Sequence, residues 1–309
     1  MEGLTLDRLR GCALGAAIGD ALGMPLEFHL PSPPEHMVSE MLAGRLPAGT
    51  VTDDTEMALA LAESLLAHSP LDGGNLVEHF VAWYHAQPAD VGVQTSTALS
   101  MHARGENWQE VVRQIEQHMP ASAGNGSLMR CWPVALMWWQ NHRQLIVDST
   151  LQSRITHPHA ECVAATVFVN TMIAELVSGA DLSHAYHTAL IQVEMPADLR
   201  QVVLDAPGKE RNQLPNTAYV RHTLEGAIWG VMTTDSFDKA LIQVVNLGQD
   251  ADTTGAVAGA LAGAAYGLKA IPESWRSLLR GEWPLNSGIQ WGEREFISLA
   301  DQLIEKSRA

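Results

Sequence analysis

The stretch GAVAGALAGAAYG, residues 255–267, has glycine at every fourth position and alanine at most of the others. Residues four apart lie on one slowly drifting stripe of an α-helix, where glycine lets another backbone approach closely. A glycine inside a helix costs about 1 kcal/mol relative to alanine, so a stripe of four requires a packing reason. A second stripe, GCALGAAIGDALG, occupies residues 11–23. The two stripes predict a pair of tightly packed helices at the centre of one domain.

Helical periodicity dominates the rest of the chain, and no segment shows the alternation expected of several strands. We therefore expect an all-α fold with one domain over residues 1–309. The apolar spacing predicts helices over 7–22, 55–68, 76–85, 95–103, 108–118, 128–139, 143–154, 159–178, 182–193, 217–232, 237–246, 254–268 and 293–304. The Pro-rich residues 31–34 and the polar residues 206–216 are expected to form loops.

Composition restricts the partners and the compartment. A formal net charge of −16 argues against a broad basic surface for nucleic acid. The three scattered cysteines argue against a disulfide framework and a structural zinc site. The N-terminus is acidic where a signal peptide needs basic residues, and the longest uncharged run is shorter than the roughly 20 residues that span a bilayer. We expect a soluble, cytoplasmic, monomeric protein without nucleic-acid or membrane partners.

Two acidic clusters flanked by threonine stand at predicted helix starts: TDDTE at residues 52–56 and DADT at residues 250–253. One interpretation is helix capping, since Asp53 and Glu56 have the spacing of a capping box. The other is a site for a hard divalent cation, because carboxylates two apart in a loop can direct their oxygens at one point. Each cluster alone favours capping.

The two clusters together favour metal binding. If their four carboxylates converge, each like-charged pair about 4 Å apart costs about 4 kcal/mol at an effective dielectric constant near 20. Two divalent cations would neutralise that charge and satisfy many oxygens at once. The glycine stripe that follows residues 250–253 predicts tightly packed surroundings for one of the clusters.

An ordered series of motifs resembles the ADP-ribosylglycohydrolase family. The series is GCALGAAIGDALG at 11–23 with Glu27 and Phe28, TDDT at 52–55, GNGSLMR at 124–130, THPH at 156–159 and GQDADT at 248–253. The resemblance covers nearly the whole chain. It implies an orthogonal all-α multi-helix bundle with a dinuclear Mg²⁺ or Mn²⁺ site in a central cleft.

The resemblance also implies roles for particular residues. The metal ligands would be Thr52, Asp53, Asp54, Asp250, Asp252 and Thr253. The acid/base residues would be Glu27 and Asp90, with the division of roles between them open. The substrate-binding residues would be Gly124, Asn125, Gly126, Ser127, Leu128, Met129, His157, Gly248 and Gln249.

Pattern alone leaves some of these roles open. Without the resemblance, the favoured interpretation of Asp90 is a loop acid or a cap for the helix near Thr95. Residues 124–127 could form an ordinary turn or could present backbone amides to a pyrophosphate. The family has Gly-Gly-Asp where this chain has Gly248, Gln249 and Asp250, so Gln249 adds a bulky side chain beside the expected metal site.

The function implied by the resemblance is metal-dependent hydrolysis of the glycosidic bond in ADP-ribosylated protein side chains, with ADP-ribosyl-arginine as the expected substrate. Two alternatives remain. The same site could act on another conjugate, such as ADP-ribosyl-serine or O-acetyl-ADP-ribose. The protein could instead bind and occlude a partner with little catalysis.

Overall fold

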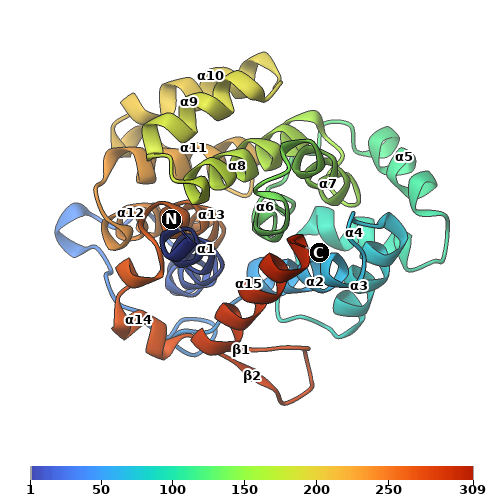
Figure 1. Cartoon of the computed structure of the whole chain (residues 1–309), viewed down its shortest axis with the longest axis horizontal. Helices are drawn as coiled ribbons and strands as arrows, with labels where there is room; N and C mark the ends of the chain where they lie inside the picture. Colours follow the sequence, from blue (N-terminus) through green and yellow to red (C-terminus); the bar gives the residue numbers. More distant parts are fainter. Residues whose placement is uncertain (1, 309) are drawn as a thin grey trace.

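A computed structural model describes residues 2–308, and this part of the chain is mostly helical with almost no sheet (Figure 1). The prediction of an all-α fold is therefore confirmed. The helices are α1 (Glu2–Gly23), α2 (Asp53–Ala67), α3 (Gly73–His85), α4 (Val93–His102), α5 (Trp108–His118), α6 (Trp132–Trp138), α7 (His142–Arg154), α8 (Ala160–Ser178), α9 (Leu182–Gln192), α10 (Ala197–Asp205), α11 (Val220–Thr233), α12 (Phe237–Val245), α13 (Ala251–Tyr266), α14 (Glu273–Leu278) and α15 (Glu293–Ser307). Two short strands, β1 (Gly281–Glu282) and β2 (Gln290–Trp291), pair antiparallel with Gly281 opposite Trp291.

The two glycine stripes pack against each other, as the sequence predicts. Helices α1 and α13 lie side by side (Figure 1), and their glycines meet in antiparallel order. A Cβ placed on Gly259 would lie 2.0 Å from the carbonyl oxygen of Gly15. A Cβ on Gly19 would lie 1.9 Å from that of Gly255. Glycine is therefore needed along this contact, because any side chain would clash with the facing backbone at this short helix separation.

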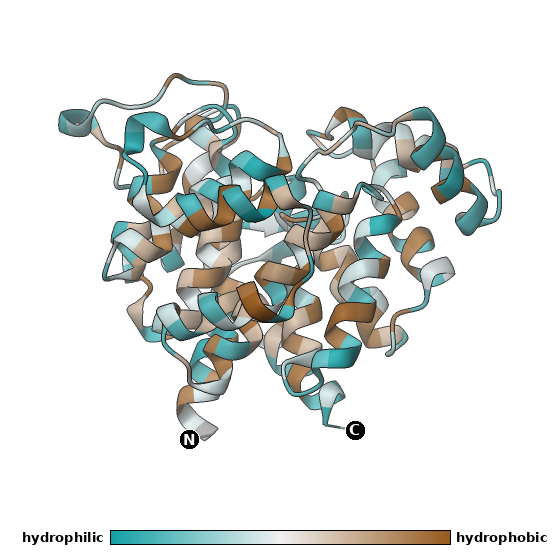
Figure 2. Cartoon of the chain, turned by 90° about the horizontal axis from the view of Figure 1, so that it is seen from above, coloured by the Kyte–Doolittle hydropathy of each residue, from teal (hydrophilic) through white to brown (hydrophobic). Residues whose placement is uncertain are grey.

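The other helices surround this pair. Helix α8 packs on α7, α9 and α13, and it is long and apolar enough to cross a membrane, with a mean hydropathy of 1.5. However, 83% of its apolar segment is buried inside the protein, which is typical of a core helix. Figure 2 shows that α1 begins and α15 ends on the same side of the molecule.

Several predicted boundaries are wrong. The helix predicted over 128–139 begins only at Trp132, because the amides of Leu128 and Met129 both bond to the carbonyl of Asn125 and close a turn. Helices α10 and α14 were not predicted. Each presents too few apolar residues for a periodic signal, with Leu199 and Val203 buried in α10 and Trp275 in α14.

Candidate active site

The two acidic clusters converge where α1 ends and where α2 and α13 begin. Asp20, Asp54 and Asp252 each offer a carboxylate oxygen, and these oxygens lie within 4.8 Å of one another. Glu27, Asp250 and Asp252 form a second group by the same measure. Because Asp252 belongs to both, the groups adjoin. The glycine contact between α1 and α13 brings the end of one helix to the start of the other, which produces this convergence.

Neither N-cap residue caps its helix through its side chain, although Asp252 Oδ1 accepts from the Thr253 amide at 3.0 Å within the first turn of α13. Thr52 is the N-cap of α2 and Asp250 that of α13, and neither side chain bonds to an amide of the first turn. The predicted capping box is wrong, since Asp53 lies inside α2 and the Glu56 carboxylate accepts a hydrogen bond from Trp83 Nε1 at 2.8 Å. Asp54 Oδ2 accepts from the Thr52 hydroxyl at 3.1 Å and Asp250 accepts from the Asn125 side chain, so N-cap bonds do not account for the clusters.

Asp20 is a member of the carboxylate group that the sequence analysis missed. Its carboxylate is completely buried and accepts hydrogen bonds from the Thr52 amide and hydroxyl, both at 2.9 Å, and from the Thr55 hydroxyl at 2.5 Å. Burial outweighs these bonds and raises the pKa of Asp20 to about 6. A signal was present, because Asp20 is the single acid within the small and apolar residues 11–23, where a charge needs partners.

The chemistry of this cluster fits a hard divalent cation. Burial, followed by the neighbouring carboxylates, raises the pKa of Asp54 and of Asp252 well above the usual value. One oxygen of Asp54, Oδ1, is buried without a hydrogen-bond partner among the described residues. A cation bound by carboxylate and hydroxyl oxygens would relieve the repulsion and supply that partner. Acidic residues 20, 54, 250 and 252 could therefore bind metal ions.

Arg45, in the loop before α2, is a second residue that the sequence analysis missed. Its Nη2 lies 2.7 Å from Glu27 Oε2, 3.2 Å from Asp90 Oδ2 and 3.6 Å from Asp252 Oδ2. The structure thus brings together Glu27 and Asp90, the two predicted acid/base residues. No sequence signal identified Arg45, because a single basic residue in a loop has no pattern.

Arg45→Gln is expected to lower the free energy of unfolding in the presence of a chelator by about 2 kcal/mol, because the acidic cluster loses its half-buried cation. Added Mg²⁺ should shrink that deficit, since a bound cation replaces the lost positive charge. Thermal unfolding with and without chelator measures both effects. Arg221→Gln, which removes the ion pair with Glu161 outside the cleft, is the matched control and should give a metal-independent deficit. An equal deficit for Arg45→Gln in both conditions would contradict the argument.

A cleft of about 520 Å³ opens beside the acids. Its lining includes Glu27, Asp53, Asp54, Asp90, Gly124, Asn125, Gly126, Met129, His157, Asp250, Asp252 and Thr253. Thr52, Ser127 and Leu128 are buried outside this lining, and the Ser127 hydroxyl accepts a hydrogen bond from Ser153 Oγ at 2.8 Å. Gly248 and Gln249 also lie outside it. The functional roles of all these residues stay predictions.

The loop at residues 124–127 is anchored on both sides of the cleft. The Gly124 amide donates to Gln94 Oε1 at 3.1 Å, and the Asn125 amide donates to the carbonyl of Ala218 at 3.1 Å. The Asn125 side chain donates to Asp250, which links the loop to the acidic cluster. Among the described residues, the amides of Gly126 and Ser127 have no hydrogen-bond acceptor, and Gly126 lines the cleft whereas Ser127 does not.

Gln249 connects two parts of the site. Its backbone has a φ of +55°, its side-chain amide donates to the His29 carbonyl at 3.2 Å, and its own carbonyl accepts from the Phe28 amide at 2.6 Å. A Cβ on Gly248 would lie 2.5 Å from the same His29 oxygen. These contacts hold the segment after Glu27 against the acidic cluster.

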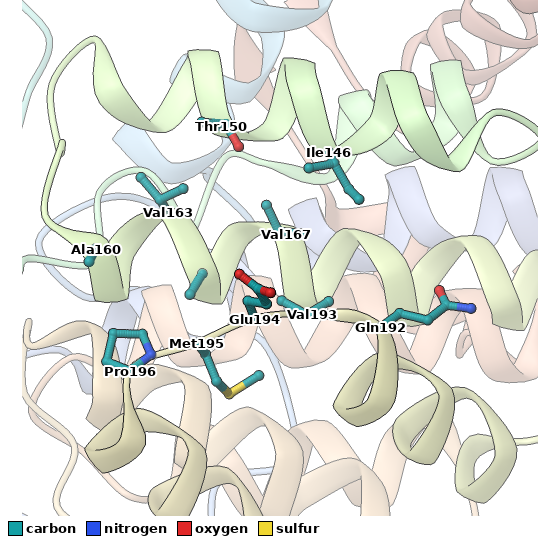
Figure 3. Close-up of a pocket in the computed structure, with 11 residues that line it drawn as sticks. Ile146, Thr150, Ala160, Val163, Val167, Gln192, Val193, Glu194, Met195 and Pro196 are labelled. Atoms are coloured by element: carbon teal, nitrogen blue, oxygen red, sulfur yellow. The ribbon is translucent and has the colours of Figure 1, made fainter.

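A larger hollow of about 690 Å³ lies between α7, α8 and residues 192–196 (Figure 3). Apolar side chains such as Ile146, Val163 and Val167 line most of it, and Glu194 is the charged residue of its lining. Because it lacks a cluster of convergent polar groups, we take the acidic cleft as the candidate site.

Comparisons with known proteins agree with the geometry. The profile of the ADP-ribosylglycohydrolase family matches residues 1–309. The chain is 35% identical over 288 residues to an ADP-ribosylarginine hydrolase of Serratia proteamaculans, covering 89% of this chain and 75% of that protein. It is 34% identical over 279 residues to a glycohydrolase of ADP-ribosyl-dinitrogen reductase from Rhodospirillum rubrum, covering 88% and 90%.

A solved structure described as an ADP-ribosylglycohydrolase-related protein complex matches with a TM-score of 0.82 and 34% identity, covering 99% of both chains. The agreement therefore extends over the full helical architecture. The chain belongs to the ADP-ribosylglycohydrolase family.

Proposed function

We propose that this protein is a divalent-cation-dependent hydrolase that removes ADP-ribose from arginine side chains of modified proteins. The observation that carries the proposal is the pair of adjoining carboxylate groups sharing Asp252 at the wall of a cleft. Relatives of similar sequence are named for the hydrolysis of ADP-ribosylarginine and of ADP-ribosyl-dinitrogen reductase, which supports the substrate class.

The cofactor in this proposal is a pair of Mg²⁺ or Mn²⁺ ions. The residues that would hold them are Thr52, Asp53, Asp54, Asp250, Asp252 and Thr253, together with Asp20. When bound, such ions neutralise clustered carboxylates, anchor sugar hydroxyls and make a nearby water more acidic. The two carboxylate groups and the unpartnered Asp54 oxygen support this assignment.

Glu27 and Asp90 are proposed to exchange protons with the substrate. Hydrolysis of a ribose glycosidic bond requires a carboxyl group that protonates the leaving group or accepts a proton from water. Burial raises the pKa of Glu27 despite its ion pair with Arg45, which favours proton exchange closer to neutral pH. The guanidinium of Arg45 lies between Glu27 and Asp90, so this end of the cleft already accommodates the kind of group that an ADP-ribosylated arginine presents.

We also propose that residues 1–309 act as one domain, as a monomer in the cytoplasm, without nucleic-acid or membrane partners. One hydrophobic cluster extends from Leu9 in α1 to Ile304 in α15, which supports a single domain. The net charge of −16 opposes binding to a polyanion.

A panel of conjugates tests the proposed function. Purified protein is incubated with ADP-ribosyl-arginine, ADP-ribosyl-serine and O-acetyl-ADP-ribose, and release of ADP-ribose is followed by chromatography. We expect release from the arginine conjugate, its loss in EDTA, and its recovery with excess Mg²⁺ or Mn²⁺. Release from another conjugate alone would reassign the substrate. No release from any, with retention of a modified partner protein, would favour occlusion instead.

A further inference from the structure

Arg130 is a buried cation that is connected through Thr156 to His157, a residue of the cleft lining. Its guanidinium is completely buried, lies 4.4 Å from the centre of the Phe80 ring, and has no carboxylate partner among the described residues. It donates to the Gln152 side chain at 3.1 Å, to the Gln152 carbonyl at 2.9 Å and to the Thr156 hydroxyl at 2.8 Å. Burial lowers the pKa of Arg130 to about 9, which still leaves it charged at neutral pH.

The Thr156 hydroxyl lies between Arg130 and His157 and contacts both. Its oxygen lies 2.7 Å from His157 Nδ1 and has Arg130 as its other side-chain partner. A guanidinium can only donate, so the Thr156 oxygen accepts from Arg130 and its own hydrogen is free to point at Nδ1. A hydroxyl oxygen can accept a second hydrogen bond, so both tautomers of His157 fit this contact; the one in which the Thr156 hydrogen points at Nδ1 leaves the ring hydrogen on Nε2.

His157 Nε2 lies beside the glycine loop of the cleft. It is 3.3 Å from the position of a Cβ on Gly124 and 3.1 Å from one on Gly126. The ring is 1% exposed and lines the cleft. Burial, followed by the charge of Arg130, lowers the pKa of His157 well below its usual value, so the ring is neutral and carries one hydrogen.

We propose that Arg130 and Thr156 are positioning residues that hold His157 as the Nε2–H tautomer, so that it donates this hydrogen to an anionic oxygen of the ligand beside residues 124–126. Under the function proposed above, on which this inference rests, that oxygen belongs to the pyrophosphate of ADP-ribose. The other tautomer would turn a lone pair toward a phosphate and repel it. A buried cation without a carboxylate partner is costly, and this role explains why the chain uses one here.

Two substitutions at one position separate this role from packing. Thr156→Val keeps the shape and removes the hydroxyl, whereas Thr156→Ser retains it. We expect the Kd for ADP-ribose to rise about tenfold in Thr156→Val and to stay near the wild-type value in Thr156→Ser, as for the loss of one hydrogen bond to a charged group. In turnover of the arginine conjugate, the increase in KM should be larger than the decrease in kcat.

Nitrogen-15 NMR of the imidazole gives a readout that needs no ligand. Wild-type His157 should show a protonated Nε2 and an unprotonated Nδ1, and Thr156→Val should show a mixture of tautomers. A proton on Nδ1 of the wild type, or equal ADP-ribose affinity in the Val and Ser variants, would overturn the inference. Failure of the wild type to bind ADP-ribose at all would instead count against the proposed function, and the NMR result would distinguish the two.

Discussion

Asp252→Ala is expected to abolish divalent-cation binding and to lower kcat/KM for the arginine conjugate by about 1000-fold or more. Asp252 belongs to both carboxylate groups, so its loss removes a ligand from each proposed cation at once. The fold should survive, because the variant also removes one of several mutually repelling buried carboxylates. Isothermal titration with Mn²⁺ and turnover of the arginine conjugate measure the two effects.

Asp235→Ala is the matched control, since Asp235 is an exposed acid paired with Lys239 away from the cleft. It should bind Mn²⁺ and turn over substrate as the wild type does. In the absence of metal, Asp252→Ala should unfold at the same temperature as the wild type or above it. Wild-type hydrolysis by Asp252→Ala would show that the cleft is not the site of the reaction.

Gly259→Ala should produce the largest loss of stability, about 3 kcal/mol or more in the free energy of unfolding. In an exposed helix the same change stabilises by about 1 kcal/mol, because alanine has the higher helix propensity. Here the added methyl group would lie 2.0 Å from the carbonyl oxygen of Gly15, so α1 and α13 must move apart along their whole contact. Urea unfolding followed by circular dichroism measures the change.

Gly3→Ala, in α1, is the control for this prediction. A Cβ on Gly3 meets nothing within 4 Å, so the substitution should be neutral or slightly stabilising. If Gly259→Ala were as stable as Gly3→Ala, close packing could not be the reason for the glycine stripes.

Much of the fold and part of the site could be predicted from the sequence. The pairing of α1 with α13 follows from the glycine spacing, because a cost repeated every four residues has few explanations other than close helix packing. The Asp54 and Asp252 clusters were recognisable because acids and hydroxyls gather there at helix starts. The turn at Leu128 was missed because its apolar residues resemble a helical pattern, whereas the turn is closed by hydrogen bonds from the Leu128 and Met129 amides to the Asn125 carbonyl.

The sequence by itself determined the helical class, the glycine contact at the centre and the identity of the acidic clusters. Each of these features follows from a pattern of residues close together along the chain. Tertiary structure decided which groups meet. It placed Asp20 under Thr52, brought Arg45 between Glu27 and Asp90, and linked the buried Arg130 to the cleft. These contacts join elements that carry no shared local pattern. The charge, hydrogen bonding and tautomer of each group therefore depend on neighbours that only the folded chain supplies.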